Sequence, residues 1–129
     1  MNKLKKFLKD WDGHPIEDYG TVESPEFKKM FRALKAALKE ICEEQNTELV
    51  NFSSSHYDGS GFIYKPATNK YVYISLGQDA LRYRVNVTRK VNAGPILIRT
   101  AEGPKDFRGG HNNFCTLDEL PEFISMLMQ

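Results

Sequence analysis

Residues 24–55 have the sequence SPEFKKMFRALKAALKEICEEQNTELVNFSSS, in which the spacing of apolar side chains changes from a helical to a strand period. Ser24 and Pro25 are typical of a helix start, because Ser caps free N–H groups and Pro fits the first turn. Apolar residues then recur every three or four positions, which predicts a helix over about 25–45. Alternation begins after this helix and predicts a strand over 49–55. The apolar stripe of the helix consists of Phe27, Met30, Phe31, Leu34, Leu38 and Ile41.

Four further segments rich in β-branched and aromatic residues follow, separated by turns of Gly, Pro, Asn and Asp. They predict strands over 62–65, 71–76, 81–88 and 96–100. No helix long enough for a crossover connection separates these strands, so we expect an antiparallel sheet of about five strands. A glycine-rich polar loop is expected over 101–115.

Helices are expected at both ends of the chain. A short apolar stripe surrounded by four lysines predicts a basic helix over 2–11, which we expect to pack on the rest of the domain. Its alternative role is contact with nucleic acid or an acidic membrane surface. Near the other end, Thr116 and Glu119 resemble a capping box, and Pro121 permits only a tight first turn before a helix that ends near Met128.

The length of 129 residues predicts one domain. It comprises the basic helix 2–11, an acidic loop over 12–23 and a core over 24–129. The expected fold class is α+β, with an antiparallel sheet of about five strands packed by a long helix and a C-terminal helix, in the order α-α-βββββ-α. A hydrophobic content of 40% excludes a disordered chain.

A net charge of +1 conceals a separation of charge along the chain. Residues 10–48 contain ten acidic and five basic residues, whereas residues 80–110 contain seven basic and two acidic ones. Glu40, Glu43 and Glu44 at the end of the long helix are the candidate partner-binding residues of the acidic part, because a basic protein surface is attracted to such a cluster.

The basic part of the chain predicts an alternative function, the binding of nucleic acid. Exposed aromatic side chains beside arginines hold single strands by stacking and phosphate contacts, and Tyr71, Tyr73, Tyr83 and Phe107 are the aromatic candidates. The alternative is that the tyrosines belong to the core and the arginines to a solvated surface. The candidate nucleic-acid or anion-binding residues are Arg82, Arg84, Arg89, Lys90, Arg99, Lys105, Arg108 and His111.

Two loops contain residues of catalytic type. Residues 53–61 combine serines, His56 and Asp58, but we interpret them as a hairpin turn, because no nucleophile elbow is present. Residues 108–113 contain two glycines that either form an anion-binding nest or make a flexible loop. The small-enzyme hypothesis, third in order, places a site on one of the loops that contain His56 and His111.

Neither a metal site nor a cofactor is expected. His14, His56 and His111 are far apart in the sequence, and neither cysteine belongs to a metal-binding motif. Cys42 lies on the apolar face of the long helix, and Cys115 precedes the last helix. We expect a reduced, cytoplasmic protein with no membrane association, since lysines interrupt the N-terminal apolar stripe and no apolar run is long enough to span a bilayer.

The segments 71–75, 96–101 and 105–114 resemble a group of uncharacterised small accessory proteins of phages, plasmids and integrative elements from Gram-positive bacteria. The resemblance implies an accessory protein of a mobile element. Small proteins of this kind often bind and inhibit a host protein, including defence nucleases, as anti-CRISPR proteins do. We therefore expect a non-enzymatic binding protein that modulates a host or defence protein, with nucleic-acid binding through residues 82–108 as the alternative.

Overall fold

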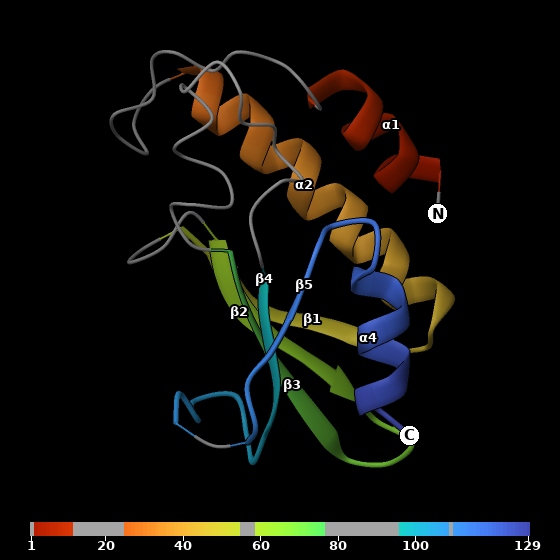
Figure 1. Cartoon of the computed structure of the whole chain (residues 1–129), viewed down its shortest axis with the longest axis vertical. Helices are drawn as coiled ribbons and strands as arrows, with labels where there is room; N and C mark the ends of the chain where they lie inside the picture. Colours follow the sequence, from red (N-terminus) through yellow and green to blue (C-terminus); the bar gives the residue numbers. More distant parts are fainter. Residues whose placement is uncertain (1, 12–24, 55–58, 77–95, 109) are drawn as a thin grey trace.

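In a computed structural model of the protein, the change in the period of apolar residues coincides with the boundary between the long helix and the first strand of a sheet (Figure 1). The structure describes residues 2–11, 25–54, 59–76, 96–108 and 110–129. The sheet has five strands in the order β1-β2-β3-β4-β5, each antiparallel to the next. This confirms the α+β class and the order α-α-βββββ-α. The elements are α1 (Asn2–Trp11), α2 (Pro25–Glu44), β1 (Glu48–Ser53), β2 (Gly59–Lys65), β3 (Lys70–Leu76), β4 (Ile96–Ala101), β5 (Asn113–Cys115) and α4 (Leu120–Leu127).

The strands that compose the sheet differ from those expected. The strand predicted over 81–88 lies outside the described residues, and β3 pairs directly with β4. The fifth strand is β5, so the expectation of a loop over 101–115 is wrong at its end. Three residues are too few to show an alternating pattern in the sequence. This strand exists because it pairs with Ile96–Ile98 of β4, which satisfies its backbone groups and buries Cys115.

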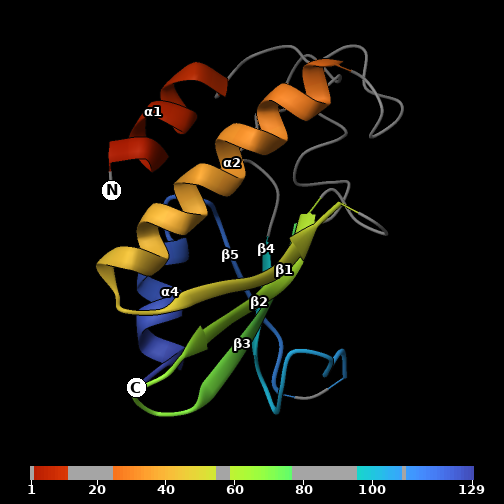
Figure 2. The same cartoon turned by 180° about the vertical axis from the view of Figure 1, so that it is seen from behind.

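The helices cover one face of the sheet and enclose the core (Figure 2). Four residues of the predicted stripe of α2 are buried, with Met30, Leu34, Leu38 and Ile41 at most 1% exposed. Leu4 and Phe7 of α1 join the same core cluster, which confirms that this basic helix packs on the domain. Among the described residues, no helix has the length and apolarity required to cross a lipid bilayer.

The C-terminal end of α2 is closed by the backbone of Asn46, which has a positive φ of 57°. Thr47 N–H donates to the carbonyl of Cys42 at 2.8 Å, and Asn46 N–H donates to that of Glu43 at 3.3 Å. These two bonds form a Schellman motif, which satisfies carbonyls that a helix end leaves without partners. The chain therefore turns sharply from α2 into β1.

A bulge in β1 positions Phe52 in the core. Val50 pairs with Phe62 and Ser53 with Ser60, so Asn51 and Phe52 together oppose Gly61. Asn51 has a positive φ of 55°, the left-handed conformation that the first residue of a G1 bulge adopts. The extra residue shifts the alternation, and the ring of Phe52 stacks on Phe31 of α2 with centroids 5.4 Å apart.

A turn over 117–119 precedes the last helix, as the sequence predicts, but the N-cap is Glu119, which makes no side-chain cap hydrogen bond. Thr116 N–H donates to Glu119 Oε1 at 3.0 Å, which is one half of the expected capping box. Leu120 and Ile124 are fully buried, and Gln45 Nε2 donates to the carbonyl of Pro121 at 2.9 Å. This bond joins the start of α4 to the end of α2.

Candidate functional site

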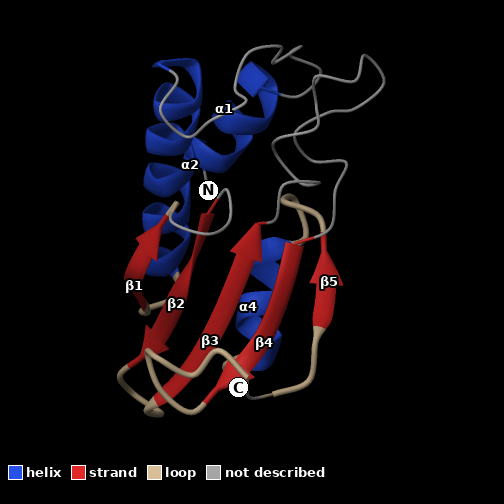
Figure 3. Ribbon diagram, turned by 90° about the vertical axis from the view of Figure 1, so that its left-hand side faces the viewer, coloured by secondary structure: helices blue, strands red, loops and turns tan. Residues whose placement is uncertain are grey.

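The sheet has a second face, here called the outer face, that α1, α2 and α4 leave uncovered (Figure 3). Strand register assigns side chains to it, because alternate residues of a strand point to opposite faces. The row across its middle contains Phe62, Tyr73 and Arg99, which are directly paired on β2, β3 and β4. The neighbouring rows add Ser60, Tyr64, Tyr71, Ser75, Leu97, Ala101 and Phe114.

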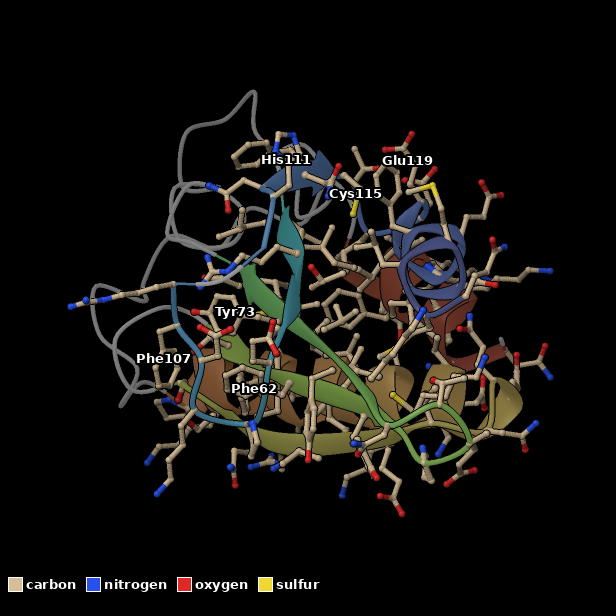
Figure 4. The ribbon with its side chains drawn as sticks, turned by 90° about the horizontal axis from the view of Figure 1, so that it is seen from below. Phe62, Tyr73, Phe107, His111, Cys115 and Glu119 are labelled. Atoms are coloured by element: carbon tan, nitrogen blue, oxygen red, sulfur yellow. The ribbon has the colours of Figure 1, made fainter. Side chains whose placement is uncertain are left out.

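An aromatic cluster occupies the centre of the outer face (Figure 4). The ring centroids of Phe62 and Tyr73 lie 5.2 Å apart. The ring of Phe107 packs against both, with centroid distances of 5.4 Å to Phe62 and 5.8 Å to Tyr73. Phe62 and Tyr73 are at most 5% exposed, whereas Phe107 is 60% exposed. The buried rings of Phe62 and Tyr73 thus support the ring of Phe107, which exposes most of its surface to solvent.

Residues 102–108, here called the Phe107 loop, are held in shape by one carboxylate. Asp106 Oδ2 accepts a hydrogen bond from the backbone N–H of Glu102 at 2.9 Å, and Oδ1 accepts one from that of Arg108 at 3.1 Å. Side-chain carboxylates commonly fix turns in this way. Lys105 and Arg108 are both exposed. The loop therefore presents an aromatic ring between two cationic residues.

Arg99 lies beside this cluster and is only 7% exposed. Its guanidinium carbon is 4.6 Å from the centroid of the Tyr73 ring, which is a cation–π contact. Its Nε and Nη2 atoms are buried, and neither has a hydrogen-bond partner in the described part of the chain. Charged donors without acceptors are rare in protein interiors, so this arrangement requires an explanation.

Further aromatic side chains extend the outer face on both sides of the cluster. Tyr64 and Tyr71 are half-buried and stack on each other with centroids 4.6 Å apart. Tyr64 Oη donates to Asn69 Oδ1 at 3.1 Å, which fixes the ring at the β2–β3 turn. On β5, Phe114 is 59% exposed.

The structure brings together part of the predicted basic set. Arg99 lies on the outer face and Lys105 and Arg108 on the loop whose Phe107 ring packs there. His111 is exposed just before β5, and its carbonyl accepts a hydrogen bond from Asn113 Nδ2 at 3.0 Å. The other basic candidates, Arg82, Arg84, Arg89 and Lys90, lie outside the described residues, as does the aromatic candidate Tyr83.

The glycine segment 108–113, interpreted as either an anion nest or a flexible loop, is described by the structure on both sides of Gly109. The N–H of Arg108 is already bonded to Asp106, and Gly109 lies outside the described residues. Gly110 has a φ of +79°, and a Cβ there would come within 2.2 Å of the Thr100 carbonyl oxygen. This glycine is required for close approach of the loop to β4.

The acidic candidates divide into two environments. Glu43 and Glu44 are exposed on the last turn of α2, which contains no basic residue. Glu40 is half-buried, and its Oε1 accepts a hydrogen bond from the backbone N–H of Lys3 at 2.9 Å. This bond lowers the pKa of Glu40 below its ordinary value of 4.5. Glu40 therefore has a structural role in the contact between α1 and α2.

The surroundings of the two cysteines are those of structural residues in a protein interior. Cys42 and Cys115 are both buried free thiols. Burial raises the pKa of Cys42, and burial together with Glu119 and Asp118 raises that of Cys115 to about 12. Within the described residues no group of three His, Cys, Asp or Glu side chains is placed to hold a metal ion. His14 and His56 lie outside that part of the chain.

Sequence reasoning identified Tyr71, Tyr73 and Phe107 but missed other members of the outer face. Phe62 and Tyr64 alternate within β2 as Tyr71 and Tyr73 do within β3, so period-two spacing of aromatics on two neighbouring strands was the available signal. Phe114 carried no such signal, because its strand has only three residues and shows no alternating pattern.

Comparison of the chain with protein-family models, curated proteins and solved structures found no match in any of the three.

Proposed function

We propose that the outer face binds single-stranded nucleic acid. The observation that carries this proposal is the exposed ring of Phe107, which rests on two buried aromatic rings and lies on a loop braced by Asp106 between Lys105 and Arg108. Surfaces that bind single strands combine aromatic rings, on which bases stack, with cations that contact the backbone. Both are present here.

The distribution of charge supports the same function. Lys105 and Arg108 lie on the Phe107 loop, whereas the three acidic candidates lie on α2, in the helical layer on the other side of the sheet. A single strand of nucleic acid that approaches the outer face therefore meets Lys105 and Arg108 beside the aromatic ring on which a base can stack. The rings of Tyr64, Tyr71 and Phe114 extend this surface beyond Phe107.

The test is a fluorescence anisotropy titration of labelled single-stranded DNA and RNA at two salt concentrations. We expect Phe107→Ala to weaken binding by about 5- to 150-fold, which corresponds to roughly 1–3 kcal/mol for one stacked base. Met126→Ala is the matched control, because Met126 is a 51% exposed apolar residue on α4. Equal affinities for the wild type and Phe107→Ala would overturn the assignment of Phe107.

The phosphate contacts are tested by the double variant Lys105→Gln/Arg108→Gln. Each phosphate contact to a single strand contributes about 0.7 to the salt dependence, so the slope of log K against log salt should decrease by about 1.4. Arg32→Gln/Lys39→Gln removes the same charges from exposed positions of α2 and should leave this slope nearly unchanged. Absence of binding at low salt would contradict the proposed function.

A second candidate function is supported by the acidic end of α2. Glu43 and Glu44 are exposed there, and the helix dipole adds negative potential at a C-terminus. We propose as this alternative that α2 binds a basic protein surface, such as the nucleic-acid channel of a host or defence nuclease. Affinity purification from a bacterial lysate should then recover a partner with the wild type and Glu122→Lys, but not with Glu43→Lys/Glu44→Lys. Recovery of the same partner by the double variant would contradict this alternative.

A further inference from the structure

We infer that the buried guanidinium of Arg99 is the receptor for a phosphate group. Arg99 lies within β4 and pairs with Tyr73, in the row that also contains Phe62. Its Nε and Nη2 atoms are buried without a hydrogen-bond partner in the described residues. A charged donor left without an acceptor destabilises a folded protein, so a bound acceptor accounts for retaining it here.

The identity of the two nitrogens indicates the shape of the missing acceptor. Nε–H and one N–H of Nη2 lie in the guanidinium plane, project from the same edge and are nearly parallel. This fork matches two oxygens of one oxyanion, and it is the geometry by which arginine binds phosphate in a bidentate manner. The guanidinium carbon lies 4.6 Å from the centroid of the Tyr73 ring, and the ring supplies no oxygen acceptor to Nε or Nη2.

The surroundings favour phosphate as the oxyanion. Tyr73 also contacts Phe107, so the fork lies within the aromatic cluster assigned to base stacking, and Lys105 and Arg108 flank Phe107 in the sequence. The phosphate is either part of a bound nucleic-acid strand or a free phosphate ion. The inference rests on the proposed function only in the first case. Because both nitrogens are shielded from solvent, the ligand enters when neighbouring side chains shift, and the low local dielectric then strengthens the pair.

The first experiment uses the wild-type protein labelled with ¹⁵N and observes the Nε–H resonance of Arg99, assigned through its own side chain. Titration with inorganic phosphate, at an ionic strength held constant with chloride, should move this resonance downfield as the hydrogen bond forms. The Nε–H resonance of Arg32, exposed on α2, is the internal control and should not move in the same way. An Arg99 resonance that does not respond to phosphate or to an oligonucleotide overturns the inference.

The second experiment compares Arg99→Lys with Arg32→Lys. Lysine keeps the positive charge but lacks the fork, so Arg99→Lys should weaken oligonucleotide binding more than tenfold, whereas Arg32→Lys should have no effect. If Arg99→Lys does not fold, the wild-type resonance decides the question alone.

The two experiments separate failure of this inference from failure of the proposed function. Oligonucleotide binding that depends on Arg99 identifies a phosphate of the strand as the ligand. A phosphate-induced shift without oligonucleotide binding keeps the Arg99 site, with free phosphate as its source, and contradicts the proposed function. Oligonucleotide binding with neither an Arg99 shift nor an effect of Arg99→Lys keeps the proposed function and overturns the inference.

Discussion

The backbone N–H of Lys3 donates a hydrogen bond to Glu40 Oε1 at 2.9 Å, and this bond joins the first turn of α1 to the C-terminal part of α2. The first N–H groups of a helix have no partner within the helix, and here a carboxylate from another helix supplies one. The negative charge is also favourable at the positive end of the α1 dipole. Glu40 therefore contributes to packing, although the sequence favoured it as a partner-binding residue.

Replacement of Glu40 by Ala should lower the melting temperature, because the N–H of Lys3 loses its acceptor. The pKa of Glu40 is lowered in the folded protein, so its contribution is present above the ordinary value of 4.5 and is lost as the pH falls through the folded-state pKa. The difference between wild type and variant, measured by circular dichroism, should thus shrink in acid. Glu43→Ala is the control, since Glu43 is exposed. A difference that does not depend on pH would contradict the role of this charge.

Gly61 should tolerate no side chain. A Cβ at this position would lie 2.6 Å from the Cα of Phe52, where the bulge of β1 crosses over β2. We expect Gly61→Ala to lower the free energy of unfolding by about 1–3 kcal/mol, as other overpacked sites do. Gly103→Ala should change it by less than about 0.5 kcal/mol, because a Cβ there has no neighbour within 4 Å. Urea titrations of both variants measure these values, and equal midpoints would contradict the bulge geometry.

Asp106 should affect binding through the shape of the Phe107 loop. Asp106→Ala removes the acceptor of the Glu102 and Arg108 N–H groups, so the ring of Phe107 loses its fixed position. The affinity for a single-stranded oligonucleotide should decrease toward that of Phe107→Ala, at most about tenfold to a hundredfold.

Electrostatics predicts the opposite sign for Asp106→Ala, since loss of a negative charge favours an anionic ligand. A decrease in affinity is therefore specific for loop geometry. Asp118→Ala removes the same charge from an exposed position before α4 and should raise the affinity slightly or leave it unchanged. Anisotropy titration distinguishes the two results, and an increase with Asp106→Ala would contradict the bracing role.

The two thiols should be unreactive in the folded protein. Burial, with Glu119 and Asp118 nearby, raises the pKa of Cys115 to about 12, so roughly one thiol in ten thousand is ionised at pH 8. Burial also raises the pKa of Cys42. We expect iodoacetamide to modify neither residue in the native state at pH 8 and both in guanidinium chloride, as measured by mass spectrometry. Rapid modification of Cys115 in the native protein would show that β5 does not bury it.

Some features of the fold follow from the sequence alone. The period of apolar residues predicts α2, the residues around Thr116 and Glu119 predict the start of α4, and the lack of a crossover helix predicts an antiparallel sheet. Each of these signals lies within one short segment or depends on the order of segments. Local geometry and capping operate over that range, so one sequence is sufficient to detect them.

Tertiary structure decided the rest. β5 forms because its backbone pairs with that of β4. The bulge at Asn51 fits because Gly61 has no side chain. Glu40 of α2 accepts a hydrogen bond from Lys3 of α1. The site depends on the same kind of relationship, since Phe107 reaches Phe62 and Tyr73 through a loop, and strand register alone pairs Tyr73 with Arg99. These partners are distant in sequence, and a single chain contains no local pattern that records which distant residues pack together.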